Sequence, residues 1–359
     1  MRLSEAFSII SGGTPKTSNP SYWNGNIPWI SIKDFVSVNR YIGLTEKTIT
    51  QDGLYNSATN LLHKDDIIIS ARGTVGEIAL IPYDMSFNQS CYGLRTKGII
   101  SPHYLFYWLK GNKDKLLKNV HGAVFDTITK NTFDSIEIDV PNPETELHIV
   151  DILGSIDNSI ENNDSITRYL EKLASEIYKR ETLCVEGKIR LEEVIEILDY
   201  KRIPLSSRER ETRKGIYPYY GATGILDYVN DYIFSGEYVL LAEDGTVIDE
   251  SGYPIVQIIK GDFWVNNHAH ILNAKNGYSN YLLYIALKNT PVSKAVTGAV
   301  QLKINQANMC ALELPQLDAE QLYSLNNEFR IIADKIFHLK DENRKLQDLK
   351  TLYLKKFFG

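Results

Sequence analysis

Two stretches of the chain, one near its middle and one at its end, carry apolar residues spaced alternately three and four residues apart. This heptad spacing places the apolar side chains along one stripe of an α-helix. Prolines occur only at or before the starts of residues 143–184 and 316–359, where a helix tolerates them. Each predicted helix has about 40 residues and a length of roughly 60 Å, more than a core helix of a domain this size needs. We therefore expect two projecting helices that pack on each other.

The predicted helix-contact positions include two polar residues. In the first helix the contact positions are Ile156, Ile160, Thr167 and Leu170, and in the second helix they are Ile332, Ile336, Leu339, Asn343 and Leu346. Thr167 and Asn343 occupy the same position of the repeat, and one polar contact position commonly fixes helix register. If the helices run antiparallel, these two residues can meet near the middle; otherwise both face water.

Short stretches of sequence recur in the same order along the two halves of the chain. Residues 2–5 resemble 190–193, 70–75 resemble 241–247, Asn88 matches Asn266, 104–107 resemble 281–284, 122–124 resemble 298–300, and 140–141 resemble 314–315. The offset falls from 188 to 174 along the chain, as expected for two related halves whose loops differ in length.

The segments outside the two helices contain short β-rich runs separated by turn residues. Amphipathic helices are predicted at 102–118 and 279–289. We expect an α+β protein with two mixed α/β domains in a pseudo-two-fold repeat, separated by two long antiparallel coiled-coil helices. The predicted segments are a first domain (1–142), a first long helix (143–184), a second domain (185–315) and a second long helix (316–359).

Composition narrows the class of protein. The 359 residues include 39 Lys and Arg and 45 Asp and Glu, for a net charge of −6, which argues against a non-specific nucleic-acid coat. No apolar run reaches the roughly 18 residues of a membrane span, and the N-terminus has no secretory signal pattern. Three widely separated cysteines form neither a metal spacing nor a disulfide framework. A cytoplasmic protein without a membrane partner is the simplest interpretation.

The sequence lacks the common catalytic motifs. It contains no GxxxxGK[ST] phosphate loop, GxGxxG fingerprint, HExxH or CxxC. Residues 19–22 (NPSY) match only half of the adenine-methyltransferase motif. His268 and His270 could ligate a metal from one strand, but ordinary polar roles are favoured because no further ligand is evident. We predict neither a metal site nor a catalytic site in this chain.

Polar loops in the first half are candidate nucleic-acid contacts. A glycine-rich loop at 11–20 permits close backbone approach, and Arg, Asn and Gln are the side chains that best distinguish base edges. Ser31 and Lys33 are expected on one face of a strand, and Ser70 and Arg72 likewise. The candidates are Lys16, Thr17, Ser18, Asn19, Ser31, Lys33, Ser70, Arg72, Thr74, Asn88, Gln89 and Lys130. The alternative for the 11–20 loop is an ordinary surface turn.

The second half has a basic cluster followed by aromatic residues, a combination suited to nucleic acid. Two glutamates interrupt the cluster, so a solvated loop is the alternative. The candidates are Arg208, Arg210, Arg213, Lys214, Tyr220, Thr223, Asn266, Asn267, His268 and Lys303. Residues 266–268 (NNH) parallel 88–90 (NQS) of the first half.

Together these motifs resemble the specificity (S, HsdS-type) subunits of type I restriction–modification systems. Residues 11–15 (SGGTP), 22–23 (YW), 27–30 (IPWI) and 72–76 (RGTVG) are similar to the family's first target-recognition domain. Residues 217–224 (YPYYGATG) and 236–240 (GEYVL) are similar to its second. The resemblance covers nearly the whole chain, but 243–246 (EDGT) stands where Arg-Gly-Thr is expected.

The resemblance implies a non-catalytic subunit that binds double-stranded DNA. Each target-recognition domain would read one half of a split, asymmetric site, and the helices would set the unread spacer. Methyltransferase subunits, two per chain, would carry S-adenosylmethionine, and restriction subunits, where present, would use ATP and Mg. This chain would hold no cofactor.

Two other classes stay open at this point. A fused nuclease or methyltransferase fragment would need a metal or cofactor constellation that the sequence does not show. A coiled-coil scaffold with two protein-binding modules would have the same helices and repeat, without a DNA target.

Overall fold

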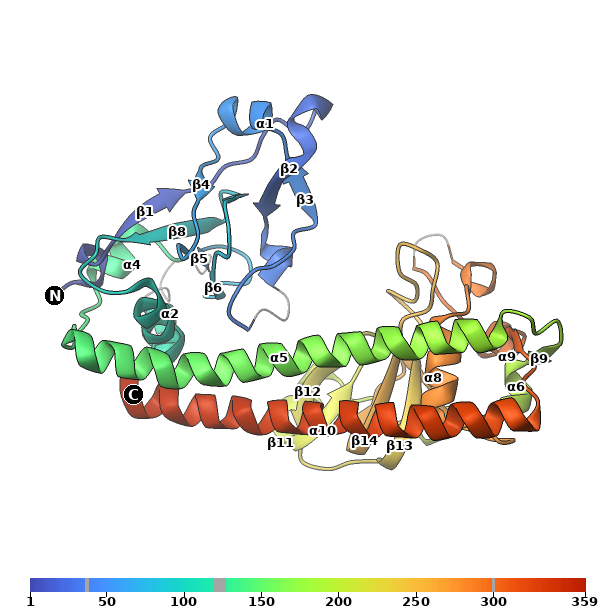
Figure 1. Cartoon of the computed structure of the whole chain (residues 1–359). Helices are drawn as coiled ribbons and strands as arrows, with labels where there is room; N and C mark the ends of the chain where they lie inside the picture. The colour runs from blue at the N-terminus through green and yellow to red at the C-terminus, as the bar shows by residue number, and fades with distance from the viewer. Residues whose placement is uncertain (36–38, 119–126, 299–300) are drawn as a thin grey trace. The chain divides into compact units, whose positions relative to one another are not determined.

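The computed structural model describes residues 1–35, 39–118, 127–298 and 301–359, which divide into two compact units. Unit 1 contains Met1–Asn163 and Glu342–Gly359, and unit 2 contains Asp164–Asp341. Each unit has one mixed α/β domain and part of each long helix (Figure 1). The repeated stretch at 122–124, and residues 299–300 of its match, lie outside the described residues.

The two long helices predicted from the heptad pattern are confirmed. Helix α5 spans Pro143–Thr182 and helix α10 spans Ala319–Phe358. Five predicted contact positions are buried, and the rest are half-buried. The buried ones are Ile156, Ile160, Ile332, Ile336 and Leu339, and the half-buried ones are Thr167, Leu170, Asn343 and Leu346. None of the helices in the described ranges has the length and hydropathy that a membrane crossing requires.

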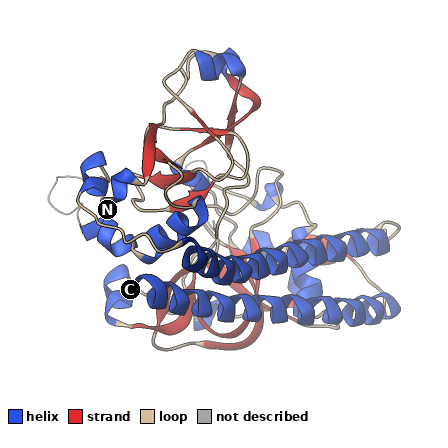
Figure 2. Ribbon diagram, turned by 60° about the vertical axis from the view of Figure 1, so that its left-hand side comes forward, coloured by secondary structure: helices blue, strands red, loops and turns tan. Residues whose placement is uncertain are grey.

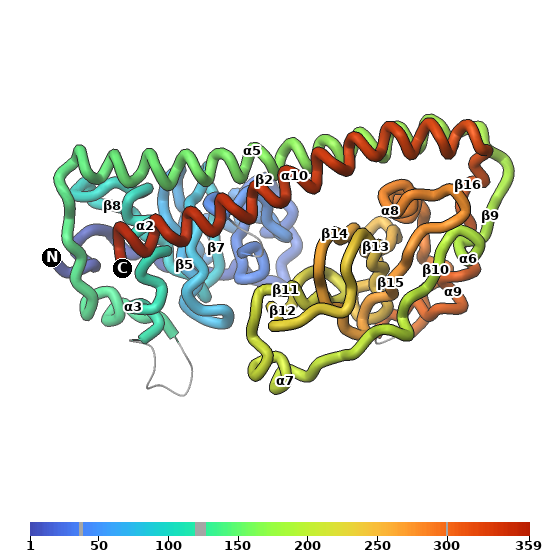
Figure 3. The backbone as a smooth tube through the Cα atoms, turned by 90° about the horizontal axis from the view of Figure 1, so that it is seen from below, coloured from blue at the N-terminus to red at the C-terminus, as the bar shows by residue number. Residues whose placement is uncertain are grey.

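Within each unit, α5 and α10 run antiparallel (Figure 3). In unit 1 the ammonium of Lys350 lies 2.6 Å from the carboxylate of Asp157, and both side chains are buried. In unit 2 the amide of Gln321 donates to the carbonyl of Glu181 at 3.1 Å.

Asn343 accepts a hydrogen bond at 2.9 Å from the amide of Asn163 in unit 1. Its expected meeting with Thr167, which belongs to unit 2, stays a prediction. The buried Asp157–Lys350 pair sets this register, because about two turns forward from Asp157 and two turns back from Lys350 bring Asn163 opposite Asn343. Thr167 lies a turn further along α5.

The domain of unit 1 has two four-stranded sheets (Figure 2). One sheet is antiparallel in the order β1 (Phe7–Ser11), β8 (Cys91–Thr96), β5 (Ile67–Ser70) and β6 (Ile78–Leu80). The other has the order β3 (Lys47–Ile49), β2 (Trp23–Ile30), β7 (Met85–Phe87) and β4 (Leu61–Leu62), with β2 and β7 parallel. Its helices are α1 (Gln51–Tyr55), α2 (Pro102–Gly111), α3 (Lys113–Lys118) and α4 (Lys130–Asp134).

The domain of unit 2 has one six-stranded sheet and a two-stranded ribbon. The sheet has the order β10 (Ile195–Ile197), β15 (Ala269–Ala274), β13 (Phe234–Ala242), β14 (Val256–Val265), β11 (Lys214–Tyr220) and β12 (Ile225–Val229). The ribbon joins β9 (Lys188–Arg190) to β16 (Glu313–Pro315). Its helices are α6 (Leu191–Val194), α7 (Ser207–Thr212), α8 (Asn280–Lys288) and α9 (Gln306–Cys310).

An apolar cluster joins each domain to the long helices. In unit 1, Leu105 of α2 belongs to the same buried cluster as Ile67 of β5, Leu153 of α5 and Phe358 of α10. In unit 2, α8 contributes to a cluster that contains strand β13, Ala174 and Phe329. Burial of these side chains supplies most of the non-directional stabilisation at the junctions.

Replacing Lys350 with Met should destabilise unit 1, because Asp157 would stay buried without its ion-pair partner. We expect a loss of about 3–5 kcal/mol in the free energy of unfolding. Urea denaturation followed by tryptophan fluorescence measures it, since Trp23, Trp29 and Trp108 report on unit 1. The exposed Lys355→Met is the matched control; equal stability of the two variants would contradict the role of the pair.

Candidate nucleic-acid interface

Five loop segments of unit 1 that are far apart in sequence lie side by side. Peptide hydrogen bonds join them: Gly13 N–H to Phe87 O at 2.9 Å, Asn88 N–H to Ile30 O at 2.9 Å, Ala71 N–H to Ser90 O at 2.8 Å, and Ile128 N–H to Ala71 O at 3.1 Å. The structure thereby brings together residues 11–19, 30–33, 70–74, 88–90 and 127–130, which include every candidate of the first half.

Unit 2 repeats this framework. Asn266 N–H donates to Tyr220 O at 3.0 Å, Glu243 N–H donates to His268 O at 2.8 Å, and Ile304 N–H donates to Glu243 O at 2.9 Å. In both units a parallel strand pair, β2 with β7 or β11 with β14, leads into these loops. The parallel between 88–90 and 266–268 that the sequence predicts is confirmed by these matching bonds.

Equivalent positions in the two frameworks carry different chemistry. Matching Ala71 with Glu243 aligns Arg72 with Asp244, and Gly73 with Gly245. Both glycines have left-handed backbones, with φ of 78° and 83°, a conformation that favours glycine. The first domain thus presents a guanidinium where the second has a carboxylate.

The turn at the centre of each framework is shaped by an asparagine. The side-chain oxygen of Asn88 accepts from the N–H of Ser90 at 3.0 Å, and that of Asn266 accepts from the N–H of His268 at 2.8 Å. Asn266 is buried and Asn88 is half-buried, whereas Gln89 and Asn267 at the tips of the turns are exposed. The amides exposed to a partner are therefore those at the tips, although the oxygen of Gln89 already accepts a hydrogen bond from the hydroxyl of Thr14.

The other candidates of unit 1 differ in their partners. Asn19 uses its side chain to accept from Ser21, and Lys33 forms an exposed ion pair with Glu46 at 3.3 Å. Among the described residues, several candidate side chains are exposed and have no ion pair. These are Lys16, Thr17, Ser18, Arg72, Thr74 and Lys130.

The expected strand position is confirmed for Ser70 and is wrong for Ser31, Lys33 and Arg72. Both the N–H and the hydroxyl of Ser31 donate to the carboxylate of Asp34, at 2.6 and 2.8 Å, so β2 ends at Ile30 and Lys33 lies on a short 3₁₀ helix. Ser70 is the buried last residue of β5, and its hydroxyl accepts from the N–H of Glu77 at 2.8 Å. Arg72 lies beyond the strand. Short polar side chains that bond the nearby backbone compete with strand extension.

The basic cluster of unit 2 is partly neutralised. Arg210 and Lys214 both bind the carboxylate of Asp227, at 3.3 and 2.7 Å. The hydrogen bond from Lys214, with a backbone bond from Tyr228, lowers the pKa of Asp227. Arg208 and Arg213 are exposed, and the guanidinium of Arg213 lies 5.9 Å from the centre of the Trp264 ring.

The aromatic and hydroxyl candidates next to this cluster have different exposures. Tyr220 is half-buried, and burial raises the pKa of its phenol to about 12. Thr223 is exposed in the following turn. Tyr220 therefore packs mainly against the domain, through an edge contact with Phe263.

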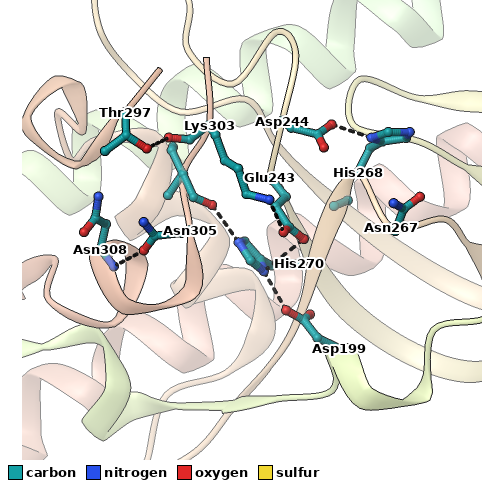
Figure 4. Close-up of polar contacts among 12 residues, drawn as sticks. Asp199, Glu243, Asp244, Asn267, His268, His270, Thr297, Lys303, Asn305 and Asn308 are labelled. Atoms are coloured by element: carbon teal, nitrogen blue, oxygen red, sulfur yellow. Dashed lines mark hydrogen bonds and ion pairs between the residues drawn. The ribbon is translucent and has the colours of Figure 1, made fainter. Parts of the chain in front are cut away.

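A charged network that sequence analysis missed lies beneath the loops of unit 2 (Figure 4). The carboxylate of Glu243 binds Arg202 at 2.6 Å and Lys303 at 3.1 Å. The Nδ1 atom of the buried His270 lies 2.6 Å from Asp199, and its Nε2 lies 2.9 Å from the carbonyl of Ile304. The contacts span 34 to 71 positions of sequence, so no local motif could indicate them.

Asp199, Glu243 and His270 could form either a cation site or an ion-pair network, and their contacts distinguish the two. Their ligand atoms lie within 4.8 Å of one another, a spacing that could hold a cation. Arg202 and Lys303 already neutralise the carboxylates, however, and both nitrogens of His270 are engaged. The arrangement therefore fits an ion-pair network that supports the loops. Burial opposes ionisation of Glu243, but bonds from Arg202 and Lys303 and the charge of His270 outweigh it and lower the pKa of Glu243.

His268 and Asp244 form a separate pair at the surface. The Nδ1 atom of His268 hydrogen-bonds the carboxylate of Asp244 (Figure 4). His268 is exposed and Asp244 is half-buried. Asp244 therefore orients the imidazole and leaves its Nε2 free of contacts from the described residues.

Together the fold and the loops define a class: a two-domain repeat protein whose domains present matching polar loop frameworks and are joined by paired long helices. The family model described as "Type I restriction modification DNA specificity domain" matches residues 1–172 and 186–350. The chain belongs to this family, with two copies of the domain.

Relatives with assigned names agree. The chain is 29% identical over 181 residues to the type I restriction enzyme MjaIX specificity subunit of Methanocaldococcus jannaschii, covering 50% of this chain and 42% of that protein. It is 39% identical over 125 residues to a putative type I restriction enzyme specificity subunit of Haemophilus influenzae, covering 35% and 31%. It is 26% identical over 297 residues to the Escherichia coli EcoprrI specificity subunit, covering 77% and 72%. The matches thus span less than half the length of the first two relatives.

A solved structure shares the fold. The crystal structure of a type I restriction–modification S subunit from M. genitalium superposes with a TM-score of 0.55 at 17% identity, covering 100% of this chain and 95% of that one. At this identity the similarity shows the fold alone.

The ion-pair network predicts an acid-dependent stability. Because the pKa of folded Glu243 lies below its ordinary 4.5, its contribution is complete above that pH and is lost as pH falls through the lowered value. Glu243→Gln should lower the thermal midpoint near pH 7 by roughly 4 °C or more, and the difference from wild type should shrink below pH 4.5. Thermal scans across pH measure both; the exposed Glu250→Gln is the control, and a pH-independent difference would contradict the assignment.

Proposed function

We propose that this chain is the DNA-specificity subunit of a type I restriction–modification enzyme. Each domain binds one half of a bipartite, asymmetric site in double-stranded DNA, and the subunit directs methyltransferase and, where present, restriction subunits to that site. Family membership supports the class of activity.

One observation supports the proposal that the DNA site is bipartite and asymmetric. The same backbone framework occurs twice, but Arg72 of the first domain aligns with Asp244 of the second, and Ser90 aligns with His268. Arginine hydrogen-bonds to guanine or to phosphate, whereas a carboxylate is repelled by phosphate and cannot donate to the acceptor atoms of guanine. Two domains of one fold with different side chains at the same positions are suited to two different half-sites. The exposed candidates in each framework are the proposed contacts.

We assign the chemistry to partner subunits and none to this chain. In this proposal S-adenosylmethionine is bound by the methyltransferase, and ATP and Mg by the restriction subunit. The saturation of the Asp199–Glu243–His270 group by Arg202 and Lys303 supports a structural role for these acids. The complex acts in the cytoplasm, where chromosomal DNA is its substrate.

Exposed apolar residues on the long helices support two copies of one partner. Leu147 and Tyr323 are 176 positions apart, as are Leu173 and Leu349, and the same offset relates the buried contact residues of α5 and α10. These four side chains are 39% to 74% exposed. Leu147 and Leu349 lie in unit 1, and Tyr323 and Leu173 lie in unit 2. A repeated apolar surface fits one methyltransferase subunit per unit.

Methylome sequencing tests the proposal. A host that expresses this chain with its cognate methyltransferase should show adenine methylation at one bipartite motif with a fixed spacer. Exchanging residues 1–142 for those of a relative should change one half of the motif only. Methylation by the chain alone, or a motif that changes in both halves, would contradict the proposal.

Arg72→Ala should impair the first domain selectively, because it removes an exposed guanidinium that has no ion pair among the described residues. We expect binding of the methyltransferase complex to its duplex to weaken by about tenfold, with relaxed base preference in one half-site. Fluorescence anisotropy with duplexes altered in either half measures this. The exposed Lys97→Ala serves as control, and unchanged affinity and preference of R72A would exclude Arg72 as a contact.

A further inference from the structure

Residues 39–42 of unit 1 connect its antiparallel sheet to the long helices. Their backbone pairs with β6: Leu80 N–H donates to Arg40 O at 2.8 Å, and Ile42 N–H donates to Leu80 O at 3.2 Å. Ile42 is fully buried in the domain. The position of this segment relative to the sheet is therefore fixed by the backbone.

The side chain of Asn39 contacts both long helices at once. Its amide nitrogen donates to Asp157 of α5 at 3.0 Å. Its oxygen accepts from Lys350 at 3.1 Å and from Gln347 at 3.3 Å, both on α10. Asn39 thus joins the buried Asp157–Lys350 ion pair, which sets the helix register in unit 1.

Arg40 binds α5 in a bidentate geometry. Its Nε lies 3.0 Å from one carboxylate oxygen of Glu161, and one terminal nitrogen lies 2.7 Å from the other. The same terminal nitrogen donates to Asn158 at 2.6 Å. The Arg40 side chain is only 11% exposed. Such a fork is directional, because both parallel bonds are lost if the guanidinium rotates.

This polar contact adds what the apolar cluster of unit 1 cannot supply. Apolar burial is non-directional, so it holds the domain against the helices without specifying one angle. In unit 2, the ion pair between Lys260 of the sheet and Asp334 of α10 is 3.9 Å long and its side chains are 49% and 60% exposed. An exposed pair of that kind stabilises little. The firmer polar contacts of unit 2 with the long helices come from α8 and the residue before it, through Lys288–Glu171 and Ser279–Asn326, and not from the sheet.

We propose that Asn39 and Arg40 are positioning residues that set the spacer selectivity of the first recognition domain. They hold the sheet of that domain at one orientation on α5 and α10. The domain then meets its half-site at one distance along the helices, and a DNA site with one base pair more or fewer is rejected. This inference rests on the proposed function.

The test uses the full complex of this chain with its methyltransferase and the double variant Asn39→Ala/Arg40→Ala. Methylome sequencing should show the bases of both half-sites unchanged. The fraction methylated at sites whose spacer differs by one base pair should rise by about tenfold, the factor expected when charge-assisted hydrogen bonds to a partly buried group are lost. Arg180→Ala, which removes an exposed arginine of α5 that pairs with its neighbour Glu181, should leave the spacer unchanged.

If Asn39 and Arg40 only stabilise the fold, the double variant should change the melting temperature and the overall methylation level, not the accepted spacer. If the double variant melts lower and methylates all sites less, with no altered spacer accepted, the inference is wrong. It is equally wrong if the bases of the first half-site change, because Asn39 and Arg40 would then contact DNA.

If the double variant does not fold, Glu161→Gln tests the same contact from α5. It removes the charge and keeps the shape, and it should widen the accepted spacers in the same direction. An unchanged spacer in folded E161Q overturns this inference but leaves the proposed function standing. A wild-type complex without any bipartite motif would overturn the proposed function and this inference with it.

Discussion

The buried ion pair between Asp157 and Lys350 is the interaction on which the arrangement of unit 1 depends. Two charges removed from water are tolerated only with complete partners, and Tyr107, which donates to Asp157 at 2.8 Å, and Asn39 complete them. Because these partners come from α2, residues 39–42 and both long helices, only one register of α5 against α10 satisfies them all. The Asn163–Asn343 contact, the apolar cluster and the placement of the first domain follow from that register.

The parts of the fold that depend on local periodicity could be predicted from the sequence. Heptad spacing indicated both long helices, and short β-rich runs indicated strands such as Ile67–Ser70. The contact of Asn343 with Asn163 in unit 1 could not be predicted, because several polar residues lie on the same stripe of α5 and periodicity alone does not select one of them. Ser31 and Arg72 were misplaced because β2 ends where Ser31 donates to the carboxylate of Asp34, and β5 ends at Ser70.

The candidate site shows the same division. Glycine, asparagine and arginine motifs located the loops, and the internal repeat correctly paired 88–90 with 266–268. The network around Glu243 was not predictable, because its members come from η4 (Asp199–Lys201), β15 and residues after β13. The four basic residues of the cluster also differ in a way that the sequence does not show. Arg210 and Lys214 bind Asp227, whereas Arg208 and Arg213 are exposed.

The loops of each framework are joined chiefly by peptide N–H and carbonyl groups, which every residue except proline supplies. An exposed tip side chain such as Asn267 therefore contributes little to keeping the loops in place, whereas Gln89 adds one side-chain bond, from the hydroxyl of Thr14. Single substitutions there can alter the outer surface while the scaffold persists. A framework built in this way lets two copies of one domain diverge in surface chemistry while both keep the same backbone.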